Sequence, residues 1–451
     1  MERKLYELTQ AQQVVIYGMR FTKNKEILNI ALEFQIENDI DLHTLMQAVN
    51  LTVLRNPNNR VRIISKDKKM YQYFSDEAQE KIEYLEFDDE KNYEKYIKKF
   101  AQTPFPNDLI DTQLYRVSVI KKPNNKYAIC GCFAHLIYDS YSSAMFFKEV
   151  FDIYCAIIQD KPLSKETISP ISAYEAQEKY LTSKKHELDA KFYEEEFFTE
   201  PQYTVLSGKK SKTFSTKERT GLREAVVCPR LEAHSLTIPI ENKFRDKVYK
   251  YASDNQITPQ IIYMLACRTY LSYVCETNDV TIDSTINKRS TIIEQKAGGT
   301  LADSIKFRTV FDNNISFKEG IDKVHSKLLD HYKHSYFSVQ AVGKIIEKKH
   351  NTPKTREYSS VIFTYQPPTQ LSKDIKYSFK RLPNGREWIA CYINIIPHNS
   401  ENEYVVDYSY MPKIIKEETI RDYHKFMINF INEGIENDKQ TINDIIGKIG
   451  R

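Results

Sequence analysis

The chain has 451 residues, of which 41% are hydrophobic and 12% aromatic, enough apolar side chain for two packed domains. Its 65 lysines and arginines nearly balance 61 aspartates and glutamates, which argues against a nucleic-acid-binding protein with a concentrated basic face. No apolar stretch is long enough to span a membrane, no signal peptide is recognisable, and the seven cysteines form no Cys-x-x-Cys pair. We therefore expect a cytoplasmic protein with no membrane segment, disulfide framework or zinc site.

Strand-like and helix-like stretches alternate through the first half of the chain, which predicts an α/β or α+β architecture. Strands are predicted at 27–37, 61–64, 71–74, 114–120 and 127–133, the last two joined by a polar turn. Helices are predicted at 42–54, with Asp41 as N-cap, and at 90–100.

A histidine and an aspartate four residues apart follow the strand predicted at 127–133. His135 and Asp139 lie where this strand ends and a loop leads to a helix expected from Ala144, with two serines ahead of it as caps. An imidazole in such a position can accept a proton near neutral pH, whereas a buried aspartate needs a basic partner. The motif is common, and by itself it favours a structural histidine.

The second half begins after a long charged helix predicted at 172–198. A polar loop at 207–212 is the best candidate for the connection between the halves. Further strands are predicted at 236–240, 280–287, 359–365, 388–396 and 404–410, and further helices at 242–255, 259–275, 315–332, 339–347 and from about Lys416. Both halves follow a similar order of elements, which indicates a duplicated fold, and Trp388 is expected in the core of the second half.

Several short motifs resemble, in order, those of the condensation domains of non-ribosomal peptide synthetases. The family's His-His-x-x-x-Asp-Gly motif corresponds to Ala-His-Leu-Ile-Tyr-Asp-Ser at 134–140. Weaker matches follow the same order at 9–12, 55–63, 105–116, 287–289, 298–304, Arg308 and 334–338. The resemblance covers essentially the whole chain, which is identified as a stand-alone condensation domain.

The resemblance implies two chloramphenicol-acetyltransferase-like lobes in a V-shaped pseudo-dimer with a central tunnel. We expect an N-terminal lobe at 1–178, with the histidine motif, and a C-terminal lobe at 179–451. The implied reaction transfers an acyl or aminoacyl group from a phosphopantetheine thioester to a small-molecule amine or alcohol. The donor would be an acyl or peptidyl carrier protein supplied in trans, with no bound cofactor and no metal.

The same resemblance assigns roles to individual residues. His135 becomes the catalytic candidate, and Asp139 becomes a structural residue that pairs with Arg289 in preference to Arg60. Tunnel-lining positions are expected for Ser140 and Ser304. Tyr138 is a further tunnel candidate, although a packing role is the preferred reading because the chain has 31 tyrosines. His331 and His334 have a spacing that metal ligands can adopt, but no third ligand is recognisable, so a core or surface position is preferred.

Two positions depart from the family motif and keep other functions open. Ala134 replaces the first motif histidine, and Ser140 replaces the glycine, which would reshape the channel or cap the next helix. The alternatives are a non-catalytic condensation-like module that docks a carrier protein, and an acyltransferase that uses free acyl coenzyme A.

Overall fold

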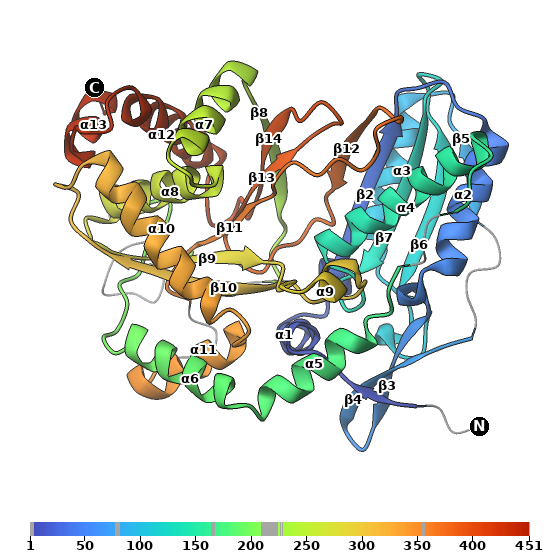
Figure 1. Cartoon of the computed structure of the whole chain (residues 1–451), viewed down its shortest axis with the longest axis horizontal. Helices are drawn as coiled ribbons and strands as arrows, with labels where there is room; N and C mark the ends of the chain where they lie inside the picture. Colours follow the sequence, from blue (N-terminus) through green and yellow to red (C-terminus); the bar gives the residue numbers. More distant parts are fainter. Residues whose placement is uncertain are drawn as a thin grey trace.

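The fold is mixed α/β, as the sequence predicts, and its two larger sheets lie in separate lobes (Figure 1). The computed structural model describes residues 4–76, 82–163, 167–208, 224–225, 227, 229–352 and 357–450. The strands form one sheet of five, one of six and one of three.

The first lobe is built on the five-stranded sheet, in the order β12-β2-β7-β6-β5. Its strands are β2 (Asn29–Ile36), β5 (Glu83–Glu86), β6 (Tyr115–Lys121), β7 (Tyr127–Ala134) and β12 (Tyr377–Leu382). Its helices are α2 (Leu42–Arg55), α3 (Glu90–Gln102) and α4 (Ser140–Ile158). The small sheet, β1 (Tyr6–Glu7), β4 (Lys69–Phe74) and β3 (Val61–Lys66), lies below this lobe in Figure 1.

Side chains along β2 show that helices cover both faces of this sheet. The Glu33 carboxylate accepts a hydrogen bond from the Tyr93 hydroxyl of α3, and the neighbouring Phe34 stacks on Phe147 of α4 at a centroid distance of 4.1 Å. Because successive side chains of a strand point to opposite faces, α3 and α4 lie on opposite faces. The central part of this sheet is therefore covered by helices on both sides.

The second lobe is built on the six-stranded sheet, in the order β10-β9-β11-β13-β14-β8. Its strands are β8 (His234–Ile240), β9 (Asp279–Ile286), β10 (Asp303–Val310), β11 (Val361–Tyr365), β13 (Cys391–Pro397) and β14 (Tyr404–Tyr410). Its layer of helices is α7 (Asn242–Asp254), α8 (Pro259–Cys275), α10 (Phe317–Lys333), α12 (Glu417–Glu436) and α13 (Ile442–Ile449).

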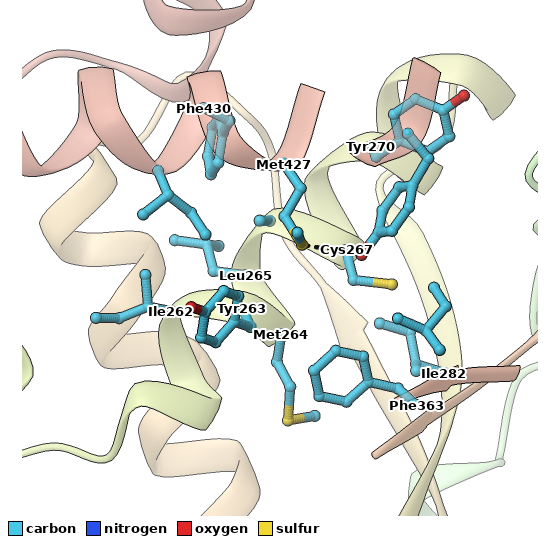
Figure 2. Packing of buried hydrophobic residues seen from close by; sticks show 14 of the residues in the cluster. Ile262, Tyr263, Met264, Leu265, Cys267, Tyr270, Ile282, Phe363, Met427 and Phe430 are labelled. Atoms are coloured by element: carbon cyan, nitrogen blue, oxygen red, sulfur yellow. Dashed lines mark hydrogen bonds between the residues drawn. The ribbon is translucent and has the colours of Figure 1, made fainter. Parts of the chain in front are cut away.

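Helix α8 forms the centre of the second core, as Figure 2 shows. Met264 and Cys267 of α8 lie near Ile282 and Phe363 of the sheet, and α12 contributes Met427 and Phe430 to the same core. Thirteen of the 17 residues of α8 are buried, so burial extends around most of its circumference. Such a pattern is typical of a helix enclosed by other elements.

Strand β12 couples the two lobes, a feature that the sequence pattern did not indicate. It belongs to the second half of the chain but pairs antiparallel with β2 at the edge of the first sheet, with Phe379 opposite Phe34. Figure 1 shows the chain leaving the second lobe to form this strand. The first lobe is therefore completed by a segment some 340 residues away in sequence, Tyr377 pairing with Ile36.

The remaining helices connect or bridge the lobes. They are α1 (Gln10–Gly18), α5 (Ile171–Leu181), α6 (Lys184–Glu196), α9 (Ile292–Lys296) and α11 (Val339–His350). Four short 3-10 helices are described, at Met19–Phe21, Lys25–Leu28, Pro57–Arg60 and Asn107–Leu109. The expected lobe boundary after residue 178 falls inside α5 and stays a prediction.

The prediction of one helix over 172–198 is wrong, because two helices meet there. Ser183 interrupts them: its hydroxyl accepts a hydrogen bond from the His186 amide and caps α6. Serine favours such local caps over the helix interior. In the polar loop expected at 207–212, positions 209–212 lie outside the described residues.

Two further expectations are corrected. Helix α4 begins at Ser140, not at Ala144, because Asp139 is its N-cap and accepts a hydrogen bond from the Ser142 amide at 2.8 Å. Trp388 precedes β13 and packs against the core of the first lobe, close to Gly18 of α1, where a Cβ would lie 2.8 Å from the indole ring.

Candidate active site

A cavity of about 870 Å³ lies where the two lobes meet. The first half contributes one face of α1 and the residues that follow β7, and the second half contributes β9, β10, α11 and the segment around Trp388. Its size is that of a pocket for an extended small molecule. His135, Ser140 and Ser304 line the cavity.

The loop that carries His135 is held by hydrogen bonds to successive backbone carbonyls. The hydroxyl of Thr300 donates to the His135 carbonyl at 2.8 Å, and the side-chain amide of Gln12 donates to the Leu136 carbonyl at 2.7 Å. The side-chain amide of Asn58 donates to the next carbonyl, that of Ile137. Since buried carbonyls need partners, three segments distant in sequence fix the shape of this loop.

The imidazole of His135 is neutral near pH 7 and reaches the cavity wall. Burial lowers its pKa, and a hydrogen bond with its own backbone and the charge of Asp139 only partly oppose this effect. Its Nδ1 is buried and forms no hydrogen bond with another residue in the part of the chain that the structure describes. A neutral imidazole with a lowered pKa can accept a proton at physiological pH without being protonated beforehand.

Asp139 borders the cavity, and its carboxylate forms a buried ion pair with Arg289. The Arg289 guanidinium donates two hydrogen bonds to it, at 2.8 and 3.2 Å, and the exposed fractions of the two side chains are 0% and 1%. Burial would raise the pKa of Asp139, but the charge of Arg289 and its hydrogen bonds, with the Ser142 and Ala302 amides, hold it below its ordinary value.

The carboxylate of Asp139 also joins the two lobes. Its Oδ2 accepts hydrogen bonds from the backbone amides of Leu301 at 3.0 Å and Ala302 at 2.9 Å, which lead into β10. The same segment is fixed at Gly299, whose carbonyl accepts from Arg289 at 3.0 Å. The loop after β7 is thus tied to the strand that carries Ser304.

Two residues named from the sequence lie away from the cavity and from the ion pair of Asp139. Tyr138 is fully buried and absent from the cavity lining, because it points into the first core, where its hydroxyl donates to Asn59 at 2.7 Å. Tyr138 is therefore a packing residue and not a tunnel residue. Arg60, the second candidate partner of Asp139, takes no part in the ion pair with that residue.

A charged cluster on the second-lobe wall was not found from the sequence. The ammonium group of Lys306 lies between the carboxylates of Asp283, at 3.1 Å, and Glu357, and all three residues line the cavity. Burial, together with the like charge of Glu357, raises the pKa of Asp283 to about 6 although Lys306 acts in the opposite sense. The strand register that places Lys306 opposite Asp283 could not be read from motifs.

Neither a metal site nor a membrane span is found in the described part of the chain. No group of three or more histidine, cysteine or carboxylate side chains there could hold a metal ion. His331 is buried beside the rings of Phe192, Tyr193 and Phe307, and burial lowers its pKa to about 3. No described helix combines the length and the apolar character needed to cross a membrane.

Comparison with known families gives one match over nearly the whole chain. A family model described as "Condensation domain" matches residues 2–446. Among curated proteins, Gramicidin S synthase 2 of Brevibacillus brevis is 22% identical over 356 residues, which are 77% of this chain and 8% of that protein. The chain therefore spans less than a tenth of the length of this relative.

Solved structures share the fold at low sequence identity. The first condensation domain of the CDA synthetase has a TM-score of 0.82 at 14% identity, with 98% of each chain covered. The starter condensation domain of the rhizomide synthetase RzmA, in complex with C8-CoA, has a TM-score of 0.81 at 13% identity and covers 98% of this chain and 96% of that one.

Proposed function

Because the chain belongs to the condensation domain family, we propose that it is an acyltransferase that forms an amide or ester from a phosphopantetheine thioester. The acyl or aminoacyl donor is an acyl or peptidyl carrier protein supplied in trans, and the acceptor is a small amine or alcohol. The product belongs to non-ribosomal peptide or related secondary-metabolite synthesis. The relatives support this reaction class, since one curated relative is named a nonribosomal peptide synthetase and others are named gramicidin S synthase and plipastatin synthase.

One observation carries the proposal: a neutral histidine reaches the wall of a cavity between the lobes on a loop that both lobes hold in place. The acceptor's nitrogen or oxygen attacks the thioester carbonyl, and the C–S bond breaks with release of the thiol. His135 accepts the proton that the acceptor loses and returns it to the departing sulfur. Much of the rate enhancement comes from holding the two substrates in line.

In this proposal Asp139 and Arg289 take no part in the chemical step; they hold the histidine loop in position. Their ion pair is buried, and each carboxylate oxygen of Asp139 already accepts hydrogen bonds from the protein. A group with its acceptor sites occupied is not available to substrate. Asp139 is therefore a positioning residue that keeps His135 at the end of β7.

Replacing His135 tests the proposal. In His135→Ala, product formation from an acylated carrier protein and an amine should fall by at least about a hundredfold, since general-base groups contribute roughly 10²–10⁴. Mass spectrometry of carrier and product measures the loss. His43→Ala, which removes an exposed histidine on α2, should keep the rate of the unaltered protein.

The same assay separates the alternatives. An unchanged rate in His135→Ala would contradict the catalytic role of the histidine. Tight binding of a carrier protein without turnover by the unaltered chain would indicate a docking module. Consumption of acyl coenzyme A in place of the acylated carrier would change the donor, which the C8-CoA complex of the RzmA domain makes a worthwhile arm of the experiment.

A further inference from the structure

The charged cluster on the cavity wall of the second lobe contains two carboxylates and one ammonium group. Asp283 of β9 lies opposite Lys306 of β10, and Glu357 precedes β11 in the chain. The Lys306 ammonium lies 3.1 Å from Asp283 and also forms an ion pair with Glu357. The exposed fractions of the side chains are 9% for Lys306, 11% for Asp283 and 21% for Glu357. The cluster is therefore largely withdrawn from bulk solvent, although it borders the cavity.

The alternation of side chains along β9 and β10 directs this cluster into the cavity. Ile282, the neighbour of Asp283, belongs to the hydrophobic core on the other face of the sheet. Asp283 and Lys306 therefore point to the cavity face. Thr285 and Ser304, two positions away on the same strands, line the cavity as well. This part of the wall presents hydroxyl and charged groups, which suits a polar or charged group of a ligand.

The cluster has one negative charge more than its lysine can neutralise. Among the described residues, Lys306 is the only ion-pair partner of Asp283 and of Glu357. Burial and the like charge of Glu357 raise the pKa of Asp283 to about 6, so a second positive charge beside it would stabilise its ionised form. A buried lysine needs one carboxylate as its partner, and the second carboxylate remains available to a cation from outside.

His135 and the cluster occupy separate positions in one cavity. The Ala302 amide donates to Asp139 at 2.9 Å, and Lys306 lies four residues farther along the same strand, which is about 13 Å. The Nδ1 of His135 is buried and forms no hydrogen bond with another described residue, so this ring atom is open to a ligand. A substrate that reacts at His135 can therefore present a second group to the cluster.

We propose that Asp283 and Glu357 bind an ammonium or guanidinium group of the substrate, so that the protein prefers an aminoacyl substrate with a basic side chain. This inference rests on the proposed function, because it concerns a substrate of the same reaction. A guanidinium group donates several hydrogen bonds in one plane and can contact carboxylates through two parallel bonds. The cation can belong to the acceptor or to the donor, and the assay below distinguishes the two.

Argininamide and citrullinamide are a matched pair of acceptors, because a guanidinium group is replaced by a neutral urea group of nearly the same size. With an acylated carrier protein as donor, kcat/KM of the unaltered protein should be at least about tenfold higher for argininamide, as expected for charge-assisted hydrogen bonds. In a second arm, carrier proteins loaded with arginine and with citrulline are compared as donors to one neutral amine. The arm that shows the preference identifies the substrate that carries the cation.

Variants of the two carboxylates test the site itself. Glu357→Gln and Asp283→Asn should each abolish most of the preference, because the remaining carboxylate is neutralised by Lys306. Glu357→Lys should reverse it, since an added positive charge repels the guanidinium group. Asp322→Asn on α10 is the control and should keep the preference, because its ion pair with Lys318 is partly exposed and outside the cavity lining. The ratio of the two rates within each variant cancels any general loss of activity, and melting temperatures verify folding.

Binding supplies a second measurement that needs no turnover. Trp388 is the only tryptophan of the chain and lines the cavity, so its fluorescence reports ligands that enter. In the unaltered protein the ligand with the preferred cation should bind at least about tenfold more tightly than its citrulline counterpart, and Glu357→Gln should remove the difference. Isothermal titration calorimetry gives the same affinities independently.

The outcomes separate this inference from the proposed function. A preference that persists in both Glu357→Gln and Asp283→Asn would overturn the cation site. Equal turnover of the arginine and citrulline substrates in both arms would also overturn it and would leave the proposed acyl transfer intact. If neither substrate is acylated in either arm, the proposed function fails, and the difference in binding affinity alone decides on the cation site.

Discussion

His135 owes its expected reactivity to the low dielectric around it more than to any charged partner. Burial lowers its pKa, and no carboxylate among the described residues hydrogen bonds to its ring. The nearby carboxylate of Asp139 is occupied by Arg289 and backbone amides. This arrangement differs from a histidine paired with an aspartate, in which the acid stabilises the imidazolium. Here the neutral form is favoured before the acceptor arrives.

The pH dependence of the rate follows from this lowered pKa. As pH falls, kcat/KM should decrease through a limb that lies below 6.5, where His135 becomes protonated. The carboxyl group of Asp283 lies in the same cavity, and its pKa is raised to about 6. Its titration must therefore be distinguished from that of His135 in the pH profile. The limb should persist in Asp283→Asn; its disappearance in that variant would assign it to the aspartate.

The buried pair of Asp139 and Arg289 predicts a large stability effect. Asp139→Ala leaves the guanidinium buried without its partner and should lower the free energy of unfolding by about 3–5 kcal/mol, measured by urea denaturation at pH 7. Asp152→Ala is the control, because its ion pair with Lys148 is partly exposed and should contribute under about 1 kcal/mol. Equal losses in the two variants would contradict the structural role of Asp139.

Acid should remove this contribution. The pKa of Asp139 is lowered in the folded protein, so its stabilisation is present above the unfolded value of about 3.9 and is lost as pH falls through the folded value. The difference between Asp139→Ala and the unaltered chain should therefore shrink below about pH 4.

At the scale of elements, two helical glycines show that packing decides whether replacing glycine by alanine stabilises or destabilises the protein. A Cβ at Gly434 of α12 would lie 2.2 Å from the ring of Phe317 at the start of α10, whereas a Cβ at Gly343 of α11 would meet nothing within 4 Å. Both positions read alike in the sequence, as a glycine inside a helix.

Alanine at the two positions should therefore have opposite effects. Gly434→Ala should destabilise the protein by about 1–3 kcal/mol through overpacking against Phe317. Gly343→Ala should stabilise it by up to about 1 kcal/mol through helix propensity. Thermal unfolding of both variants measures the pair, and a stabilised Gly434→Ala would contradict the packing of α12 on α10.

At the scale of the whole molecule, β12 makes the first lobe depend on the second. Phe34 packs against Tyr377 and Phe379, with centroid distances of 5.7 and 5.1 Å, and these rings come from β12. Without β12, the edge of β2 would present unpaired backbone groups and an uncovered aromatic ring.

Residues 1–178 expressed alone should therefore fail to form a stable monomer. We expect aggregation, measured by analytical ultracentrifugation, because the β2 edge has no partner. Fusing residues 371–384 to this fragment through a flexible linker should recover part of the monomer. A dispersed NMR spectrum of the unfused fragment as a monomer would show that β12 is dispensable.

The sequence by itself determined the local features of this protein. Asp41 as N-cap of α2, the hairpin of β6 and β7, and the position of His135 after a buried strand all follow from residue types within a few positions of one another. At Ser183 and Asp139, a capping side chain competed with the hydrophobic periodicity of the flanking residues. The capping side chain decided where the helix begins, whereas the periodicity predicted a wrong boundary.

Only the tertiary structure decided which distant groups meet. It placed Arg289 on Asp139, Thr300 and Gln12 on the histidine loop, Lys306 between two carboxylates, and β12 on the first sheet. These contacts join segments separated by tens to hundreds of residues, and their geometry depends on strand register and lobe packing, which residue patterns do not encode locally. The ordered motifs could name the family and the histidine, but the cavity wall around it had to come from the fold.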